Sequence, residues 1–247
     1  MMAHTKTGPA GDSFKCEANG LKELAKADVL PVARVISYGP NFITTEYIAS
    51  TRPSEDFFNK FGKGLAQLHK YKQPEYGFYE NNFIGATPQL NIPSEGEKHN
   101  WAQFFFNKRL LPQYLLLEDS EKVTERIKIG FAKLEREIDS LLSGAESEGA
   151  SLLHGDLWSG NYICNTRDQA VLIDPAVYYG HREADLAMTR LFGYFPPDFY
   201  SAYNSEYPLM DGWQEREKIY QLYHLMNHLN LFGKSYLGEV ERLITSI

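Results

Sequence analysis

The sequence has little cysteine and no long apolar run. Its 247 residues include only Cys16 and Cys164, too few for a disulfide framework, and this indicates a reducing compartment such as the cytoplasm. No stretch approaches the ~20 apolar residues that a transmembrane helix needs, and the first residues show no apolar core of the signal-peptide type. These shortages predict a cytoplasmic protein with no membrane partner.

Lysine and arginine are fewer than the acidic residues, 25 against 32, so the net charge is −7. A general nucleic-acid surface needs clustered lysine and arginine to neutralise phosphates, so we expect no nucleic-acid partner. With 43% hydrophobic and 23% charged residues, the composition is that of an ordinary globular protein. The length suffices for one domain, or for one large and one small lobe.

One stretch concentrates the residues that can carry chemistry. It is HGDLWSGN, residues 154–161, and it follows an apolar run at 151–153 that is typical of a buried strand. Gly155 and Gly160 favour tight turns, so we expect a bent loop rather than a helix. A second apolar run ends at Asp174. The pattern predicts two adjacent strands whose ends bring polar side chains together.

Three of those side chains, Asp156, Asn161 and Asp174, match the needs of phosphoryl transfer. A kinase-type site uses one Asp to orient the attacking hydroxyl and accept its proton, and then an Asn and a second Asp as oxygen ligands for Mg²⁺. Asp156 takes the first role, and Asn161 and Asp174 take the other two. The competing interpretation is that these residues only cap turns. Their spacing, followed by an apolar strand that ends in Asp174, favours the kinase-type site.

The same motif, continued by IDPAVYYGHREADLA at 173–187, resembles the fructosamine kinase (ketosamine-3-kinase) family. Trp158 in the loop and the Asp-Pro pair at 174–175 distinguish that family from aminoglycoside and choline kinases, which are similar in fold, and from the more distant protein kinases. The resemblance covers nearly the whole chain from about Phe14 onward. Further matching segments are 82–89, 101–111, 191–195 with Phe199 and Tyr203, and 223–233.

The resemblance implies an α+β, protein-kinase-like fold with two lobes. We expect a truncated N-terminal lobe at residues 1–49, with helix C, two strands and the hinge, and a mainly helical catalytic lobe at 50–247. It implies ATP and Mg²⁺ as cofactors. It also implies a small ketosamine or a glycated lysine as acceptor, phosphorylated on the 3-hydroxyl of its sugar, which serves deglycation. The alternative acceptor is an aminoglycoside, choline or another amino-alcohol.

The resemblance also assigns roles outside the loop. The backbone of Glu46, Tyr47 and Ile48 is expected to meet the adenine, and Glu17 corresponds to the helix-C glutamate. Without the resemblance, Glu17 would be a solvated helix charge, and the other three an ordinary strand end. Candidates for contacts with the acceptor are Trp158, Gln89, Tyr178, His224 and His228.

Two residues are expected to support the catalytic loop without touching substrate. They are His154 and Asp185, and Asp185 would do so by accepting backbone N–H groups of the loop. Its simpler interpretation is a charge at a helix N-terminus. His69, near the end of a predicted helix, is expected to be a structural histidine rather than a catalyst.

The N-terminus departs from the family pattern. Family members carry a glycine-containing phosphate loop and then a strand with the lysine that holds the phosphates and pairs with the helix-C glutamate. Here the opening residues fall where that strand would end, so the lysine position is either occupied by Met2 or missing. Lys6 is the nearest candidate but lies past the expected place, so we expect Glu17 to lack its partner. The chain is then either a shortened kinase or a non-catalytic pseudokinase.

The small lobe is expected to contain only two strands, at 32–38 and 42–48, beside a helix that starts near Phe14. Two strands make a marginal sheet with an open edge. We therefore expect a partly mobile lobe, or a homodimer in which a second copy completes the sheet. Beyond it, helices are predicted at 54–71, 101–117, 120–142 and 214–232, with an ordered loop at 72–100.

Overall fold

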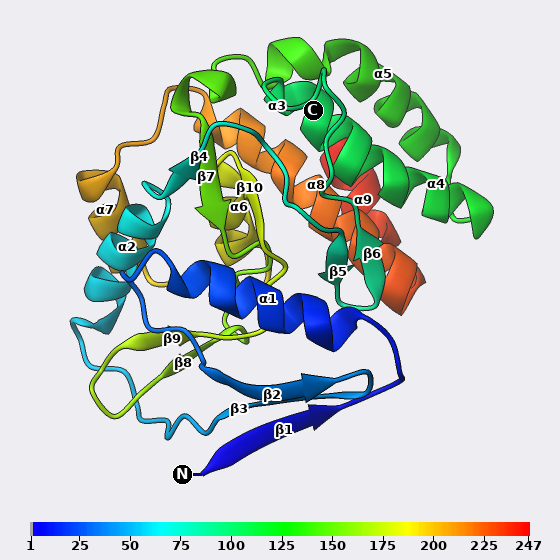
Figure 1. The fold of residues 1–247 in the computed structure, drawn as a ribbon. Helices are drawn as coiled ribbons and strands as arrows, with labels where there is room; N and C mark the ends of the chain where they lie inside the picture. Colours follow the sequence, from blue (N-terminus) through cyan, green and yellow to red (C-terminus); the bar gives the residue numbers. More distant parts are fainter. Residues whose placement is uncertain (1) are drawn as a thin grey trace.

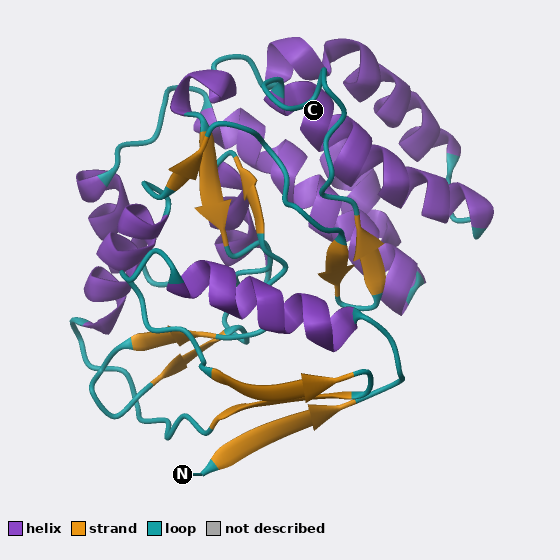
Figure 2. Cartoon of the chain, viewed as in Figure 1, coloured by secondary structure: helices purple, strands orange, loops and turns teal. Residues whose placement is uncertain are grey.

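The computed structural model describes residues 2–247. These form a small lobe built around one antiparallel sheet and a larger lobe made mostly of helices, and this is the kinase-like arrangement that the sequence indicates (Figures 1 and 2). Helix α1 lies between the small sheet and the rest of the molecule. The elements of the small lobe are β1 (Ala3–Thr7), α1 (Ser13–Ala25), β2 (Val35–Gly39) and β3 (Phe42–Glu46).

The small sheet has three strands, so the expectation of two is wrong. Strand β1 pairs with β3 in antiparallel register, from Ala3 opposite Glu46 to Thr7 opposite Phe42. Strand β3 is therefore central, and the edges belong to β1 and β2. Most side chains of β1 are exposed, so this strand lacks the apolar alternation by which a strand is recognised in a sequence. Completion of the sheet by a second copy stays a prediction.

A small hydrophobic cluster holds α1 against the sheet. Phe14, Ala18 and Leu21 recur at helical spacing, as predicted, and are buried together with Ile43 of β3. Burial of a large apolar side chain of this kind contributes roughly 1.5–3 kcal/mol. Val171, which comes from the larger lobe, belongs to the same cluster. The two lobes therefore share packing at this point.

In the larger lobe, α8 packs against α4, α6 and α9, and α2 packs against α7 at the other side of the lobe (Figure 1). The predicted apolar stripe of α2 is present, since Phe57, Phe61 and Leu65 are buried. No helix within residues 2–247 is long and apolar enough to cross a membrane. The helices named here are α2 (Phe57–Leu68), α4 (Leu111–Asp119), α6 (Glu183–Leu191), α7 (Pro197–Glu206), α8 (Trp213–Phe232) and α9 (Leu237–Ile244).

The segment at 72–100, predicted as a loop, contains three short strands. Strand β4 pairs with β7, and β5 and β6 form a hairpin whose turn at Gly85 lies beside Leu231 of α8. The hairpin also contacts α1, so it bridges the two lobes (Figure 1). These strands have two or three residues each, too few for a periodic pattern. Their bounds are β4 (Lys72–Gln73), β5 (Asn82–Ile84) and β6 (Thr87–Gln89).

The helix predicted at 101–117 is interrupted by a π-helical turn that carries the buried Arg109. The helix predicted at 120–142 begins five residues later, where the side chain of Thr124 caps it by accepting a hydrogen bond from the N–H of Ile127. These segments are α3 (Trp101–Phe105), η1 (Phe106–Leu110) and α5 (Glu125–Leu141), followed by η2 (Ala145–Glu148).

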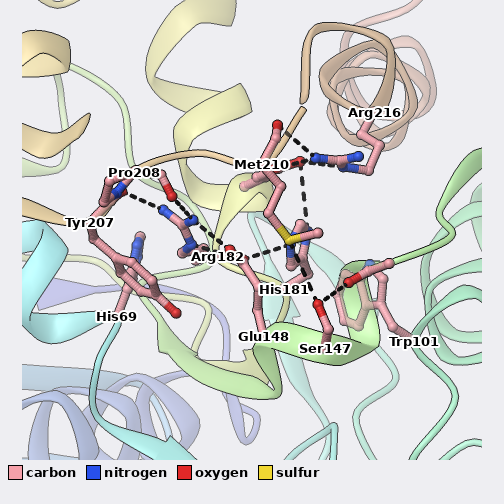
Figure 3. Close-up of polar contacts among 12 residues, drawn as sticks. His69, Trp101, Ser147, Glu148, His181, Arg182, Tyr207, Pro208, Met210 and Arg216 are labelled. Atoms are coloured by element: carbon pink, nitrogen blue, oxygen red, sulfur yellow. Dashed lines mark hydrogen bonds and ion pairs between the residues drawn. The ribbon is translucent and has the colours of Figure 1, made fainter. Parts of the chain in front are cut away.

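A buried ion-pair network, here called the Glu148 network, joins η2 to α6 and to the chain beyond α7 (Figure 3). The guanidinium of Arg182 donates Nε and Nη2 to the two carboxylate oxygens of Glu148, at 2.8 and 2.5 Å. It also donates to the backbone carbonyls of Tyr207 and Pro208 and lies 3.6 Å from the ring centre of Tyr207. His181 Nε2 lies 2.9 Å from the same carboxylate. The network therefore ties together three segments that are far apart in the sequence.

Candidate active site

The catalytic loop starts where the buried strand β7 (Ala150–Leu153) ends at His154. Gly155 follows with φ +83°, and a Cβ atom there would lie 2.0 Å from the carbonyl oxygen of Ala176. Only glycine fits this position, because the left-handed backbone and the close approach both exclude a side chain. At Gly160 the reason is space rather than backbone conformation, since a Cβ would meet the ring of Trp158.

The two strands that lead to the polar side chains are not adjacent, so that expectation is wrong. Strand β7 pairs with β4 and with β10 (Tyr178–Gly180), whereas β8 (Tyr162–Cys164) and β9 (Ala170–Leu172) form a separate hairpin. Contacts between the loops that follow β7 and β9 bring the polar side chains together instead. His154 Nε2 lies 2.9 Å from the carbonyl of Ile173, and the N–H of Ile173 donates to the carbonyl of Asn161.

Asp156 and Asn161 are in direct contact. The amide Nδ2 of Asn161 donates to the backbone carbonyl of Asp156 at 2.7 Å and to its carboxylate Oδ2 at 3.0 Å. Burial raises the pKa of Asp156 to about 7, although the hydrogen bond from Asn161 opposes the shift. Since its nitrogen faces Asp156, Asn161 keeps its amide oxygen for a cation.

Lys6 pairs with Glu17 and Asp174, which corrects the expectation that Glu17 lacks a partner. Its ammonium Nζ lies 2.8 Å from Glu17 Oε2 on α1 and 2.8 Å from Asp174 Oδ1. Burial alone would lower the pKa of Lys6, but the two carboxylates outweigh it and raise the pKa, so the ammonium stays charged. Lys6 is therefore the ion-pair partner that Glu17 was expected to lack. The added strand β1 is what brings Lys6 to this position.

Asp174 has φ +53°, in the left-handed region that Asp tolerates better than most residues. Its side chain is 43% exposed, so the carboxylate is accessible. The amide oxygen of Asn161 and the carboxylate of Asp174 are hard oxygen donors of the kind that Mg²⁺ prefers. Within residues 2–247 no group of three His, Cys, Asp or Glu side chains is arranged to hold a metal. A cation here would therefore complete its shell with phosphate and water oxygens.

A cavity of about 150 Å³ lies under the small sheet and ends at Lys6 and Asp174. The N–H groups of Glu46 and Tyr47 donate to the carbonyls of Arg34 and Met2. All three predicted hinge residues line the cavity, and its other apolar lining residues are Leu21, Ala33, Ile43, Ile163 and Ile173. Apolar lining residues together with the charged Lys6 and Asp174 are suited to a nucleotide base and its phosphates.

A larger cavity, of about 430 Å³, is lined by Asp156 and is here called the acceptor pocket. Trp158 and His228, both named as acceptor candidates, line it. A third cavity, of about 280 Å³, is lined by Lys6, Asp174 and Asp156, so it shares lining residues with each of the other two. The three neighbouring cavities are here called the cleft, and Asp156 lines both the third cavity and the acceptor pocket.

The contact expected of Asp185 is present. Its carboxylate accepts the backbone N–H of His154 at 2.7 Å and that of Gly155 at 2.8 Å. Burial alone would raise the pKa of Asp185, but hydrogen bonding to His69 and the backbone N–H of Gly155 lower it, so the group stays ionised. His69 is fully buried, between Asp185 and the hydroxyl of Tyr203, as expected of a structural histidine.

The sequence and the fold can now be compared with those of known proteins. The sequence model of the fructosamine kinase family matches residues 4–247. A "probable ketoamine kinase" of Vibrio parahaemolyticus is 40% identical over 242 residues, which are 95% of this chain and 80% of that protein. The chloroplastic "protein-ribulosamine 3-kinase" of Oryza sativa subsp. japonica is 36% identical, over 97% of this chain and 69% of that one.

The chain belongs to the fructosamine kinase family.

Solved structures of the family have the same fold. The crystal structure of a "putative fructosamine-3-kinase" from Thermobifida fusca matches with a TM-score of 0.89 at 32% identity, over 99% of this chain and 84% of that one. An ADP-bound aminoglycoside phosphotransferase matches with a TM-score of 0.57 at 15% identity, and this likeness shows the shared fold alone. The family's fold, as expected from the loop motif, is therefore confirmed.

Three residues that were predicted to contact the acceptor, Gln89, Tyr178 and His224, lie in the core of the protein, so those assignments are wrong. Gln89 is 1% exposed, and its amide bonds to Asn82, to the carbonyl of Ala176 and to the hydroxyl of Tyr223. Gln89 thus joins β6 to the segment that follows Asp174 and to α8.

Tyr178 and His224 are also buried in the core. Tyr178 is 2% exposed, stacks with Trp101 and lies against the guanidinium of Arg109, at 4.0 Å from its ring centre. His224 is 4% exposed, on the inner face of α8. Burial lowers its pKa to about 3, so it is neutral. His228, one helical turn later, reaches the acceptor pocket, but His224 does not line it.

Sequence reasoning missed three aromatic residues that line the acceptor pocket: Phe192, Phe232 and Tyr236. They stand at the end of α6, at the end of α8 and in η3 (Lys234–Tyr236). Apolar periodicity carries no signal for them, because each lies where a helix ends or a short turn begins. The available sequence signal was that Phe192 and Phe232 fall within segments that match the family.

Proposed function

We propose that this protein transfers the γ-phosphate of ATP to a sugar hydroxyl of a ketosamine, at the 3-position, and so takes part in deglycation. The observation that carries the proposal is the place of Asp156. Asp156 lines both the cavity that Lys6 and Asp174 also line and the acceptor pocket. The names of the Vibrio and rice relatives support a ketosamine acceptor, and the rice name supports the 3-position.

The residues of the cleft divide the chemistry between them. Asp156 orients the acceptor hydroxyl and receives its proton, and a pKa near 7 makes the carboxylate an effective base at neutral pH. The hydrogen bond from Asn161 holds that carboxylate in place. Lys6, positioned by Glu17, binds phosphate oxygens. Ile48 is the hinge residue that we assign to the adenine, because the N–H groups of Glu46 and Tyr47 already donate within the lobe.

Asn161 and Asp174 would hold Mg²⁺, which supplies positive charge that neutralises the phosphates during transfer. Asn161 is fixed by its bonds to Asp156, and Asp174 by its ion pair with Lys6. The protein thus aligns nucleotide and acceptor by means of groups that other contacts already orient, which favours rate through positioning.

Two alternatives make different predictions. The pseudokinase hypothesis rested partly on a missing lysine, and the contacts of Lys6 with Glu17 and Asp174 remove that ground. An aminoglycoside or choline acceptor is weakened by the low identity to the aminoglycoside phosphotransferase, 15%, against 32% to the Thermobifida structure. Both of the chain's cysteines are free thiols, which supports our proposal of a reducing, cytoplasmic location.

The deciding experiment measures Mg²⁺-dependent ATP consumption with fructose-lysine, with choline, with an aminoglycoside and without acceptor. We expect consumption with fructose-lysine alone, and a loss of at least about 10³-fold in Asp156→Asn, a change that keeps the shape of the side chain. Asp198→Asn, at an exposed carboxylate on α7, is the matched control and should change nothing. Nucleotide binding without turnover for any acceptor would instead support the pseudokinase, and full turnover in Asp156→Asn would contradict the proposed base.

A further inference from the structure

Aromatic rings gather at the acceptor pocket. Trp158 comes from the catalytic loop, Phe192 from the end of α6, His228 and Phe232 from α8, and Tyr236 from η3. The rings belong to four separate elements and nevertheless surround one cavity of about 430 Å³. Two of them keep much of their surface accessible, since Trp158 is 38% exposed and Phe232 is 63% exposed. Accessible aromatic surface at a pocket points to a ligand that covers it.

His228 is the centre of this group. Its ring centre lies 4.3 Å from that of Phe192, 5.3 Å from Phe232 and 5.2 Å from Tyr236. Its Nδ1 lies 2.9 Å from the carbonyl oxygen of His224, which fixes the orientation of the ring. Burial lowers the pKa of His228, so the ring is neutral at pH 7 and puts no positive charge into the pocket.

Among the described residues, no lysine or arginine lines the acceptor pocket. Among the described residues that line it, Asp156 is the one with a charged side chain; the others are aromatic, aliphatic or neutral polar. The faces of aromatic rings carry partial negative charge and attract a cation, most strongly in sites shielded from water. The aromatic rings that line the pocket, together with the acidic side chain of Asp156, therefore favour a cationic guest.

We propose that the acceptor pocket selects ketosamines by their protonated amine, with the ammonium held against the rings of Trp158, Phe232 and Tyr236 while the sugar hydroxyl faces Asp156. This rests on the proposed function, and it names the feature of the substrate that the pocket recognises. An alkylamine bonded to a sugar carbon bears a positive charge at neutral pH, since lysine-type amines have a pKa of about 10.4. Free sugars, sugar ethers and sugar amides lack that charge and are discriminated against.

The test uses two ligands of matched shape. One is fructose with a butylamino group at C1, and the other is its neutral 1-O-butyl ether. Dissociation constants are measured by calorimetry at pH 7, which needs no turnover. We expect wild type to bind the amine at least about tenfold more tightly than the ether. Phe232→Leu and Tyr236→Leu, which keep apolar volume but remove a ring, should weaken amine binding by about fivefold to thirtyfold and ether binding by less than about twofold.

Leu231→Ala is the control within the pocket, because it removes apolar surface without removing a ring, and it should weaken both ligands equally. Tyr194→Leu, at a ring 72% exposed elsewhere, should change neither. Phe232 is itself exposed, so its variant should fold, and thermal unfolding checks this. Trp158→Leu gives an independent variant on a different element.

The outcomes separate this inference from the function on which it rests. Equal binding of amine and ether by wild type, or equal losses for both in the ring variants, overturns recognition of the ammonium. Acceptor-dependent ATP consumption together with equal binding leaves the kinase assignment intact. Selective amine binding without phosphate transfer overturns the kinase assignment and supports the pocket. Failure to bind either ligand overturns the inference.

Discussion

Two clusters of charged side chains in this molecule have similar composition and different surroundings. Lys6, Glu17 and Asp174 meet in the cleft with side chains 33%, 15% and 43% exposed. Glu148 and Arg182 meet in the Glu148 network with side chains 9% and 0% exposed. The first cluster is open to a ligand, whereas the second is enclosed by protein (Figure 3).

The difference lies in how completely each cation is satisfied by its own chain. Arg182 donates to Glu148, to two backbone carbonyls and to the hydroxyl of Tyr203, so its donors are used internally. Lys6 makes two ion pairs, and it lines two of the cavities in the cleft. A buried ion pair is costly to break because it leaves an unpaired charge, while an accessible one is free to take an anionic ligand. The enclosed cluster should therefore govern stability and the open one activity.

The largest expected effect breaks the enclosed cluster. Arg182→Met removes the cation and leaves Glu148 buried beside His181 alone, so the free energy of unfolding should fall by about 3–5 kcal/mol in urea denaturation. Lys60→Met, which removes an exposed lysine that pairs with Asp56 and Asp168, should lower stability much less than Arg182→Met does. If Arg182→Met unfolds the protein outright, Arg182→Lys should show an intermediate loss of stability. Lysine keeps the positive charge but cannot donate to both carboxylate oxygens of Glu148 in the planar geometry of a guanidinium. Losses no larger than that of Lys60→Met would contradict the comparison.

The next effect tests the open cluster. Lys6→Met should lower turnover by about 10²-fold, equivalent to about 3 kcal/mol, because a preorganised positive charge at the phosphates is lost. Its unfolding free energy should change less than in Arg182→Met, since Asp174 is 43% and Glu17 15% exposed, more than either member of the enclosed pair. Lys15→Met, at an exposed lysine on the same helix as Glu17, is the control and should leave turnover unchanged. A large loss of stability with intact turnover would place Lys6 with the enclosed cluster.

A smaller effect follows from acidification. Burial alone would raise the pKa of Glu148, but hydrogen bonds from His181 and Arg182 outweigh it and lower the pKa from 4.5 to about 2. A carboxyl whose pKa is lower in the folded state stabilises the fold above its unfolded pKa, and this contribution is lost as the pH falls toward the folded pKa. Between about pH 7 and pH 3, wild type should lose about 2 kcal/mol relative to Glu148→Gln. Parallel pH profiles of the two proteins would show that Glu148 does not contribute in this way.

The smallest effect concerns a residue that links stability to activity. His69→Phe removes the hydrogen bond to Asp185, which holds the catalytic loop by two N–H groups. We expect kcat to fall by about tenfold at an unchanged KM for ATP, because the position of Asp156 becomes less well defined. Tyr203→Phe, which removes the partner on the far side of His69, should cost less. A lowered melting temperature with unchanged kcat of the folded protein would assign His69 a structural role alone.

Much of the site could be predicted because its parts are close in sequence. The loop from His154 to Asn161 places two of the chemical groups five residues apart, and their contact is confirmed. The position of Asp185 relative to this loop was also predicted, and both of its hydrogen bonds are present. Helical spacing correctly marked the buried faces of α1 and α2.

Other parts could not be predicted because they depend on segments that are far apart. Lys6 reaches Asp174 across 168 positions of the chain. Its place depends on the register of β1 against β3, about which the polar sequence of β1 says nothing. Likewise, an aromatic residue has the same sequence signal whether it is buried, as Tyr178 is, or accessible, as Phe232 is.

The sequence by itself determined the family and the kinase-like fold, and it indicated the three polar residues proposed for phosphate transfer, because local spacing sets which side chains share a turn or a helix face. Only the tertiary structure decided that Lys6 pairs with Glu17 and Asp174, that Gln89, Tyr178 and His224 belong to the core, and that Phe192, Phe232 and Tyr236 line the acceptor pocket. Those outcomes depend on how separate elements pack, and no local pattern of residues specifies that packing.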